Sequence, residues 1–461
     1  MRIHIVSIAG VMTAFLGKAL KNKGHIVSGS DQDNIFPPIS DIIQKAKISY
    51  NQTPINKNID LAIIGSSYNS FSRTKSEFEQ IKSLDIPYIS ATNYIAQNIA
   101  KKNSILVAGS FGKTTITGLI SQILLEAKFD PNFMIGGQMI SNIDSVRFGD
   151  STWSVIEADE SIHGLDIQAK FLYYPVKYLV LTSINWEHKD SYKTEEENEQ
   201  AYFKLIKKVP KNGFIVANEK IASTVTTVKN PNTKIITYGN KNSDYSIKSF
   251  TIHKNLSFIT IIGPKKEFVV KTNLVGQFNF ENILAAIALA DQFKIDIKII
   301  QTAIEKYLGI KRRLELIFNK NDTYIYDDFA QSAPRIESSL NAIKHQFPEH
   351  KIIVYFEPHA SFLQTINGLT NFEQSFKNAD KIILGKLKFN PQINKTDRVS
   401  ASDYKKIVGS KLQYIPLEEG VVKFLTDNSK YKTVIINMSS GGIENHQILE
   451  NVINNLKNQN V

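Results

Sequence analysis

A short glycine-containing segment with a lysine and two threonines is where this sequence could first do chemistry. Residues 109–115 read Gly-Ser-Phe-Gly-Lys-Thr-Thr, after the apolar run 104–108 and before an apolar pattern of helical period. In such a turn the backbone N–H groups can bind phosphate, Lys113 can reach the terminal phosphates, and the Thr114 hydroxyl can hold Mg²⁺. Val107 stands where the widespread G-x-x-x-x-G-K-[ST] pattern has its first glycine, so a turn that merely needs glycine is the alternative. The segment predicts binding of a nucleoside triphosphate.

Two further apolar runs end in clusters of acidic and polar residues. Residues 154–156 lead to Glu157, and residues 178–181 lead to a cluster that contains His188. Because the carboxyl ends of parallel strands meet at one edge of a sheet, both clusters are expected near the phosphate-binding turn. A carboxylate beside phosphates is a suitable ligand for Mg²⁺, and we assign this role to Glu157. His188 could complete a second metal site or orient a substrate, or it could simply bond a loop carbonyl.

Two adjacent arginines stand out in a chain that is poor in arginine. Arg312 and Arg313 lie where the sequence pattern changes from one unit to the next. At such a junction they could clamp phosphate charge when domains close, or they could form a surface ion pair.

The first 97 residues alternate strand and helix from the start. A strand, a turn at Gly10, a helix and a second strand precede Asp31, which indicates a βαβ unit. Asp31 lies about twenty residues beyond the turn, where Rossmann-type units place a carboxylate near a ribose. Ser7 and Ala9 weaken the glycine pattern, and a tight turn with a helix cap explains Gly10 and Asp31 equally well.

The length of 461 residues suggests about three domains. Strand and helix patterns alternate along most of the chain, so the fold class is expected to be α/β. We predict a Rossmann-like domain at 1–97, a central P-loop ATPase-type domain with a mixed sheet at 98–310, and a Rossmann-like domain at 311–461. Strands of the last domain are expected at 323–329, 351–356, 381–384 and 433–437.

Composition narrows the function classes. With 42% hydrophobic residues and no apolar run near the roughly twenty residues of a membrane span, no transmembrane helix is expected. The N-terminus is a strand pattern rather than a secretion signal, so the protein is expected in the cytoplasm. The absence of cysteine excludes disulfides, thiolate metal sites and cysteine nucleophiles. The net charge of +11 comes from scattered lysines with few arginines, which argues against a nucleic-acid partner and a nucleic-acid ATPase.

Taken together, these blocks resemble the Mur ligase family, ATP-dependent amide-bond ligases of bacterial cell-wall precursor synthesis. Residues 109–115 fit the family's G-T-x-G-K-[TS]-[TS] with Ser at the second place. Residues 157–160 look like its E-A-D-E, whose first Glu binds Mg²⁺, and residues 187–190 look like its D-H-x-D, whose histidine serves a second metal or the substrate. The resemblance covers nearly the whole chain and implies ATP and Mg²⁺ as cofactors.

Three more segments carry the resemblance. Residues 276–282 are similar to G-x-H-N-x-x-N, whose asparagines face the adenine, and residues 312–315 and 327–330 are similar to the R-R-[FL]-E and D-D-[FY]-[AG] segments that close over ATP. The resemblance thus implies catalytic Lys113, Glu157, His188 and Arg313; ATP-binding Gly109, Ser110, Phe111, Gly112, Lys113, Thr114, Thr115, Asn279, Asn282, Arg313 (on phosphate) and Asp328 (near the ribose); metal-binding Thr114, Glu157 and His188; and substrate-binding Ala9, Gly10, Val11, Ser30, Asp31, Ser66 and His359.

Within the family, residues 4–10 and the lack of an obvious lysine for carbamylation after His188 look like the branch that acts directly on UDP-N-acetylmuramate. Residues 29–40 and 356–358 are similar to the recycling ligase, which attaches the tripeptide L-alanyl-γ-D-glutamyl-meso-diaminopimelate, whereas His359 matches the L-alanine ligase. We expect the tripeptide ligase, acting as a monomer or weak homodimer, with the L-alanine ligase as the alternative.

Some positions depart from this branch. Phe111, Phe278 and the pair Gln331-Ser332 stand where the branch usually has histidines. A nucleotide-binding relic without ligase activity is therefore a further alternative.

Overall fold

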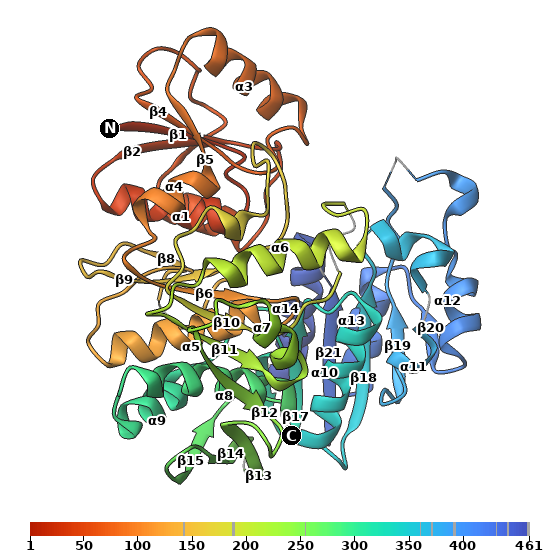
Figure 1. Ribbon diagram of the computed structural model, residues 1–461. Coiled ribbons are helices and arrows are strands. Elements are labelled where there is room, and N and C mark those ends of the chain that lie inside the picture. The colour runs from red at the N-terminus through yellow and green to blue at the C-terminus, as the bar shows by residue number, and fades with distance from the viewer. Residues whose placement is uncertain are drawn as a thin grey trace. The chain divides into compact units, whose positions relative to one another are not determined.

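The chain folds into three β-sheets with helices packed on their faces (Figure 1). The computed structural model describes residues 1–141, 143–186, 190–253, 255–359, 361–369, 372–390, 393–429, 431–439 and 442–458. An N-terminal unit comprises Met1–Leu274 and Asn279–Ile310, and a C-terminal unit comprises Val275–Phe278 and Lys311–Val461. The first and central sheets belong to the N-terminal unit, and the third sheet belongs to the C-terminal unit. The predicted α/β class with three sheets is confirmed.

The first sheet has five parallel strands in the order β3-β2-β1-β4-β5, and the strand order reverses between β1 and β4. Alternate side chains of β1 face opposite sides of the sheet, so Ile3 and Ile5 share a core with α1 and α2, while Val6 shares a core with α3. Ligands of such open sheets bind outside the carboxyl ends of the strands, at the point where the order reverses. The elements are β1 (Arg2–Val6), α1 (Val11–Asn22), β2 (Ile26–Ser30), α2 (Ile39–Lys45), β3 (Ser49–Tyr50), β4 (Leu61–Ile64), α3 (Ser72–Ser83), β5 (Tyr88–Ser90) and α4 (Ala91–Asn98).

The central sheet has ten strands in the order β15-β14-β13-β12-β11-β10-β6-β9-β7-β8. Strands β12 to β7 of this order run parallel, whereas β8 and the β13-β14-β15 meander add antiparallel pairs at the two ends. Strand β6 lies between β10 and β9, so the segments that follow these three strands leave the sheet side by side.

The elements of the central region follow in chain order. They are β6 (Asn103–Ala108), α5 (Lys113–Glu126), β7 (Asn132–Met134), β8 (Val146–Arg147), β9 (Trp153–Glu157), η1 (Lys170–Leu172), β10 (Tyr178–Leu181), α6 (Glu195–Lys208), β11 (Phe214–Asn218), η2 (Glu219–Ile221), α7 (Ala222–Val228), β12 (Lys234–Gly239), β13 (Tyr245–His253), β14 (Leu256–Ile262), β15 (Glu267–Thr272), α8 (Gln277–Gln292) and α9 (Ile297–Lys306).

The third sheet has six strands in the order β16-β17-β21-β18-β19-β20, all parallel except β16. Apolar side chains cover both of its faces, as a doubly wound sheet requires. Its elements are β16 (Glu315–Lys320), β17 (Thr323–Asp328), α10 (Ala333–Gln346), β18 (Lys351–Glu357), η3 (Ser361–Gln364), η4 (Ile366–Leu369), α11 (Phe372–Ser375), β19 (Lys381–Leu384), η5 (Lys395–Asp397), α12 (Ala401–Val408), β20 (Leu412–Tyr414), α13 (Glu418–Asp427), β21 (Thr433–Ser439) and α14 (Ile443–Asn458).

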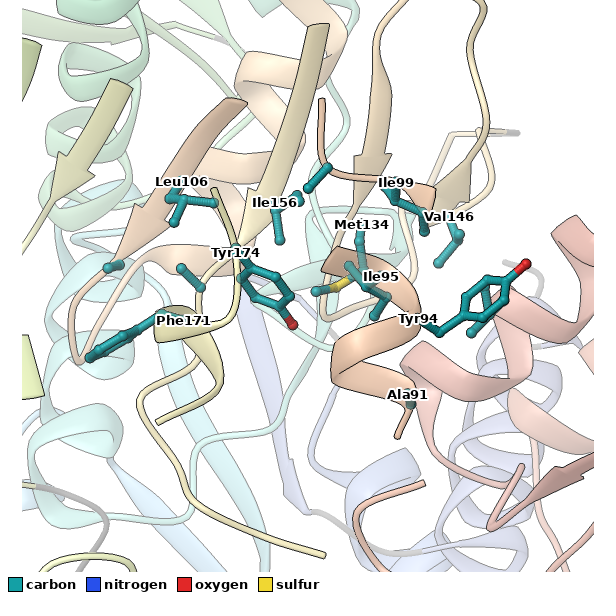
Figure 2. Close-up of a cluster of buried hydrophobic side chains, with 14 of the residues drawn as sticks. Ala91, Tyr94, Ile95, Ile99, Leu106, Met134, Val146, Ile156, Phe171 and Tyr174 are labelled. Carbon is teal, nitrogen blue, oxygen red and sulfur yellow. The ribbon is translucent and has the colours of Figure 1, made fainter. Parts of the chain in front are cut away.

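One hydrophobic core joins the first and central sheets. Figure 2 shows Tyr94 and Ile95 of α4, and Ile99 directly after it, in the same cluster as Met134 and Ile156 of the central strands. All five side chains are buried. The protein's two N-terminal sheets therefore share a hydrophobic core, in addition to the cores that each sheet forms with its own helices.

None of the helices in the described part of the chain is long and apolar enough to cross a lipid bilayer.

Candidate active site

The turn between β6 and α5 has the geometry of a phosphate-binding loop. We call Gly109–Gly112 the phosphate loop. Gly109 and Gly112 have φ angles of 121° and 79°, which side-chain-bearing residues rarely adopt. A Cβ atom on Gly109 would lie 2.2 Å from Thr182 Oγ1, and one on Gly112 would lie 2.3 Å from Asn282 Oδ1. Since α5 begins directly after this loop, the free N–H groups of its first turn are available for an anion.

The residues that follow β10 hold the phosphate loop in place. Ser110 N donates to Ser183 Oγ at 3.0 Å, and Asn185 N donates to Ser110 Oγ at 2.9 Å. Thr182 Oγ1 donates to the carbonyl oxygen of Phe111 at 2.7 Å. The sequence pattern predicted that this strand end lies near the loop but did not identify these hydrogen bonds.

Strand order brings Thr114 and Glu157 together. Glu157 ends β9 and pairs with Val107 of β6, two strands side by side in the sheet. Thr114 Oγ1 donates to Glu157 Oε1 at 3.0 Å, and Gly136 N donates to Glu157 Oε2 at 2.6 Å. A hydroxyl and a carboxylate oxygen are hard donors of the kind that Mg²⁺ takes beside substrate phosphates and water. These two residues therefore fit a Mg²⁺ ion.

The second half of the predicted metal site cannot be placed. Glu187, His188 and Lys189 lie outside the described residues, so the roles of His188 stay predictions. In the ranges that the structure describes, no three His, Cys, Asp or Glu side chains form a metal-binding group.

Lys113 is engaged by a carboxylate that the sequence pattern did not single out. Lys113 Nζ donates to Glu160 Oε2 at 2.7 Å, and the Glu160 side chain is only 1% exposed. Beside it, Lys170 Nζ donates to Asp159 Oδ2 at 2.8 Å. Burial by itself raises the pKa of Asp159, but the charge of Lys170 and hydrogen bonds from Lys170 and Ser161 hold that pKa well below its ordinary value. Both carboxylates thus face ammonium groups at the edge of the sheet. Glu160 could have been suspected because it is the last carboxylate of the segment that starts at Glu157.

Asn282 lies against the phosphate loop. It is buried in α8, and its Nδ2 donates to Asn279 Oδ1 at 3.2 Å. The close approach of its Oδ1 to Gly112 places this amide pair next to the loop. The carbonyl oxygen of Thr115 accepts a bond from Tyr307 at 3.3 Å. The adenine-binding role of the two asparagines stays a prediction.

At the first sheet, Asp31 closes the turn that follows β1. Asp31 is 4% exposed, its Oδ2 accepts from Ala9 N at 2.8 Å, and its Oδ1 accepts from Gln32 N at 2.8 Å. Gly10 is the N-cap of α1 and Val11 is its first residue. Asp31 therefore fixes the turn, and its predicted contact with a ribose stays a prediction.

The segment after Glu160 packs on the first sheet. Gly164 has a φ of 68°, and a Cβ atom there would lie 2.8 Å from Ser66 Cα. Ser90 Oγ and Thr92 Oγ1 both donate to the Asp166 carboxylate, at 3.1 and 2.7 Å. Burial raises the pKa of Asp166. The predicted substrate residue Ser66 thus lies in contact with the segment that follows the acidic end of β9.

In the C-terminal unit the two adjacent arginines differ in their surroundings. Arg312 Nε lies 3.3 Å from Asp327 Oδ2, and the Arg312 guanidinium donates to the carbonyl oxygen of Ser439. Arg313 is exposed. Arg312 therefore links strand ends of the third sheet, and the phosphate role predicted for Arg313 stays a prediction.

Asp328 is buried at the end of β17. Burial raises its pKa to about 6, although the hydroxyl of Ser339, which donates to its Oδ2, and the charge of Arg313 act in the opposite direction. Its predicted contact with the ribose is not tested by this geometry.

His359 follows β18 beside a buried glutamate. His359 Nε2 lies 3.5 Å from Glu357 Oε2, and His359 N donates to Gln331 Oε1 at 3.1 Å. Burial raises the pKa of Glu357, but the hydrogen bond and charge of His359, a hydrogen bond from Asn445 and the charge of Lys388 together leave that pKa below its usual range.

The residues that replace family histidines have definite surroundings. Gln331 Nε2 donates to the carbonyl oxygens of Glu357 and Met438, at 3.3 and 3.2 Å, and so bridges the ends of β18 and β21. Phe111 and Phe278 are 39% and 38% exposed, so neither ring is a core side chain.

Comparison with known proteins identifies the middle of the chain. Residues 107–290 match the Mur ligase middle domain. The UDP-N-acetylmuramate–L-alanine ligase of Clostridium kluyveri is 28% identical over 451 residues, which are 96% of each chain. The enzyme of the same name from Pelagibacter ubique is 29% identical over 462 residues, again 96% of each chain.

Solved structures share the whole fold. The UDP-N-acetylmuramate–alanine ligase of Thermotoga maritima matches with a TM-score of 0.78 at 21% identity over 98% of both chains. A murein peptide ligase of Psychrobacter arcticus matches with a TM-score of 0.69 at 23% identity over the full length of both chains.

Proposed function

Since the chain belongs to the Mur ligase family of ATP-dependent amide-bond-forming ligases, we propose that it joins an amino acid to the carboxylate of UDP-N-acetylmuramate, with L-alanine as the acceptor. The phosphate loop, Lys113 and the Thr114–Glu157 pair carry this proposal, because they place N–H groups, an ammonium and hard oxygens at one strand edge. That set suits a triphosphate with its cation.

The chemistry follows from what each group can do. A carboxylate is a poor acyl donor, so the muramyl carboxylate attacks the γ-phosphorus of ATP, and ADP leaves. The resulting acyl phosphate is attacked by the acceptor amine, an amide bond forms, and inorganic phosphate leaves. The N–H groups of the loop and Lys113 hold the phosphates and neutralise their charge during the transfer. Thr114 and Glu157 would hold Mg²⁺, which supplies further charge neutralisation when bound. Arg313 is proposed to contact phosphate and Asp328 the ribose.

The first sheet is proposed to bind the UDP sugar. Its edge presents the turn 7–10 and the end of β2 at the point where the strand order reverses. This is where open α/β sheets bind nucleotides. Ser66 contacts the segment after the acidic end of β9, which supports a sugar site close to the phosphate loop.

The choice of L-alanine revises the acceptor expected from the sequence. The tripeptide was expected from residues 29–40 and 356–358, but both curated relatives named above are L-alanine ligases that align over 96% of the chain. The alanine ligase structure also gives a higher TM-score than the murein peptide ligase structure. The L-alanine ligase, the alternative from the sequence, is thus better supported than the tripeptide ligase.

The direct test supplies ATP, Mg²⁺ and UDP-N-acetylmuramate together with either L-alanine or the tripeptide, and identifies the product by mass spectrometry. We expect UDP-N-acetylmuramyl-L-alanine and one ADP per amide bond. Product from the tripeptide alone would contradict the proposal that L-alanine is the acceptor. ATP binding without product from either acceptor would favour a nucleotide-binding relic that lacks ligase activity.

Two variants complete the test. Lys113→Ala removes the ammonium that faces the phosphates and is expected to abolish product formation. Lys306→Ala is the matched control, because Lys306 forms an exposed ion pair with Glu126 in the same unit and should leave the rate unchanged.

A further inference from the structure

We infer that His4 and Glu77 are positioning residues of the UDP-sugar site, acting through Ser30 at the end of β2. This inference rests on the proposed function, because that function assigns the carboxyl edge of the first sheet to the nucleotide sugar. Neither residue belongs to the set predicted from the sequence.

Strand register places the members of this group on one face of the sheet. His4 of β1 pairs with Ser28 of β2, and Val6 pairs with Ser30, so these four side chains share a face. On that face Val6 packs in the same core as Phe78 of α3. Glu77 precedes Phe78 in α3, and its carboxylate accepts a hydrogen bond from Ser30.

Four polar side chains form one series of hydrogen bonds, namely those of Ser28, His4, Ser30 and Glu77. His4 is 1% exposed, with Nδ1 2.9 Å from Ser28 Oγ and Nε2 3.3 Å from Ser30 Oγ. Ser30 Oγ donates to Glu77 Oε2, which lies 3.6 Å from His4 Nε2. The Glu77 side chain is 14% exposed.

Only one order of donors satisfies every group when His4 is neutral. Ser30 gives its proton to Glu77, so its oxygen accepts from His4 Nε2–H. His4 Nδ1 then accepts from the Ser28 hydroxyl. Each bond polarises the next, and the chain ends on a carboxylate, which is the strongest acceptor available.

This series of hydrogen bonds ends at the edge of the proposed UDP-sugar site. Ser30 is the last residue of β2, and its carbonyl oxygen accepts from Ile8 N at 3.1 Å. The next residue, Asp31, accepts from Ala9 N. Ser30 therefore adjoins both bonds that tie β2 to the turn after β1, and any movement of Ser30 moves that turn.

Packing alone does not explain why these residues are polar. Ile3 and Ile5 fill the opposite face of β1 with apolar side chains, and Val6 does the same at the next position on the His4 face. A buried imidazole and carboxylate cost desolvation energy that an apolar pair would avoid. A role in fixing the geometry of the adjoining edge accounts for their presence.

The test measures binding of UDP-N-acetylmuramate and of ADP by calorimetry, using the full chain without turnover. We expect Glu77→Ala to raise the Kd for the UDP sugar about tenfold and to leave the Kd for ADP within twofold, since a hydrogen bond to a charged group is lost. Glu77→Gln keeps an acceptor and should restore most of the affinity. The matched control is Glu79→Gln on the same helix, an exposed residue paired with Lys82, which should change neither constant.

Steady-state kinetics separate positioning from a general loss of stability. A positioning role raises the KM for the UDP sugar while the KM for ATP and kcat stay near the original values. An equal change in both KM values, or an unchanged Kd for the UDP sugar in Glu77→Ala, would overturn the inference. If Glu77→Ala does not fold, Ser28→Ala decides the matter, because it removes only the bond to His4 Nδ1 and should raise the same Kd.

Failure of the proposed function has a different signature. In that case the unaltered protein would not bind UDP-N-acetylmuramate at all, and this inference would fall with it. Binding by the unaltered protein that equals binding by Glu77→Ala overturns this inference alone.

Discussion

The substitution Glu160→Gln should lower the free energy of unfolding of the unliganded protein. It should also lower the Kd for ATP. Lys113 Nζ and Glu160 Oε2 lie 2.7 Å apart, with side-chain exposures of 13% and 1%. Removing the charge of one partner from a buried ion pair costs about 3–5 kcal/mol, because the other charge is left uncompensated. The Gln amide keeps an acceptor at the same place, so we expect a loss of about 3 kcal/mol. The neighbouring carboxylate of Asp159 does not replace it, since it is bound by Lys170.

A triphosphate supplies the missing negative charge. On the proposed function, ATP would compete with Glu160 for Lys113 in the unaltered protein, whereas in Glu160→Gln it would meet an ammonium without that rival. If about half of the lost stabilisation is regained on binding, the Kd for ATP falls about tenfold, since 1.4 kcal/mol corresponds to one factor of ten.

The assay combines thermal unfolding with calorimetric titration of ATP in the absence of the UDP sugar. Glu160→Gln should unfold at a lower temperature than the unaltered protein, and saturating ATP should raise its midpoint by more than it raises that of the unaltered protein. Glu126→Gln is the control, because Glu126 sits at the other end of α5 in a more exposed pair with Lys306 and should cost under about 0.5 kcal/mol. Weaker ATP binding by Glu160→Gln would refute the idea that Glu160 competes for Lys113.

Three further expectations follow from the same geometry. Gly112→Ala should raise the Kd for ATP at least tenfold, because φ is 79° and the new Cβ would lie 2.3 Å from Asn282 Oδ1; unchanged binding by calorimetry would contradict this. Glu157→Gln should raise the Mg²⁺ concentration for half-maximal activity about tenfold at saturating ATP, and an unshifted Mg²⁺ titration would argue against a metal ligand there. The pKa of Asp328 is raised from 3.8 to about 6 by burial, so its contribution to stability is full below pH 4 and is lost as the pH rises through 6. Asn at position 328 does not titrate, so Asp328→Asn avoids this loss of about 3 kcal/mol. The free energy of unfolding of the variant, relative to that of the unaltered protein, should therefore rise by that amount between pH 4 and pH 7. Denaturant unfolding that shows the same difference at both pH values would contradict the raised pKa of Asp328.

Much of the fold could be predicted because its signals are local. The run of apolar residues before Gly109 and the periodic pattern after Lys113 defined β6 and α5, and the runs at 351–356 and 381–384 fall within the observed β18 and β19. The order of strands was not predictable in the same way. Nothing local states that β9, 50 residues along the chain from β6, is its neighbour, because that pairing depends on packing across the sheet.

The contacts of the candidate site were likewise predictable only in part. Thr114 and Glu157 were predicted near one another because strand ends of a parallel sheet converge, and the structure brings them within hydrogen-bond distance. The pairing of Lys113 with Glu160 was missed because it depends on the conformation of the irregular segment after β9. His4 belongs to the segment that resembles the family branch, but it was given no site role, because a single histidine within a strand pattern does not reveal which side chains lie beside it.

The continuous core beneath α4 limits how far this protein can be rebuilt from parts. Tyr94, Ile95 and Ile99 lie among side chains of the central strands (Figure 2). A fragment cut near residue 97 would carry that apolar face into water, and a chimera that borrows its first sheet from a relative would meet mismatched neighbours. Exchange of the proposed UDP-sugar specificity between relatives would therefore require the graft to include the opposing residues of the central sheet.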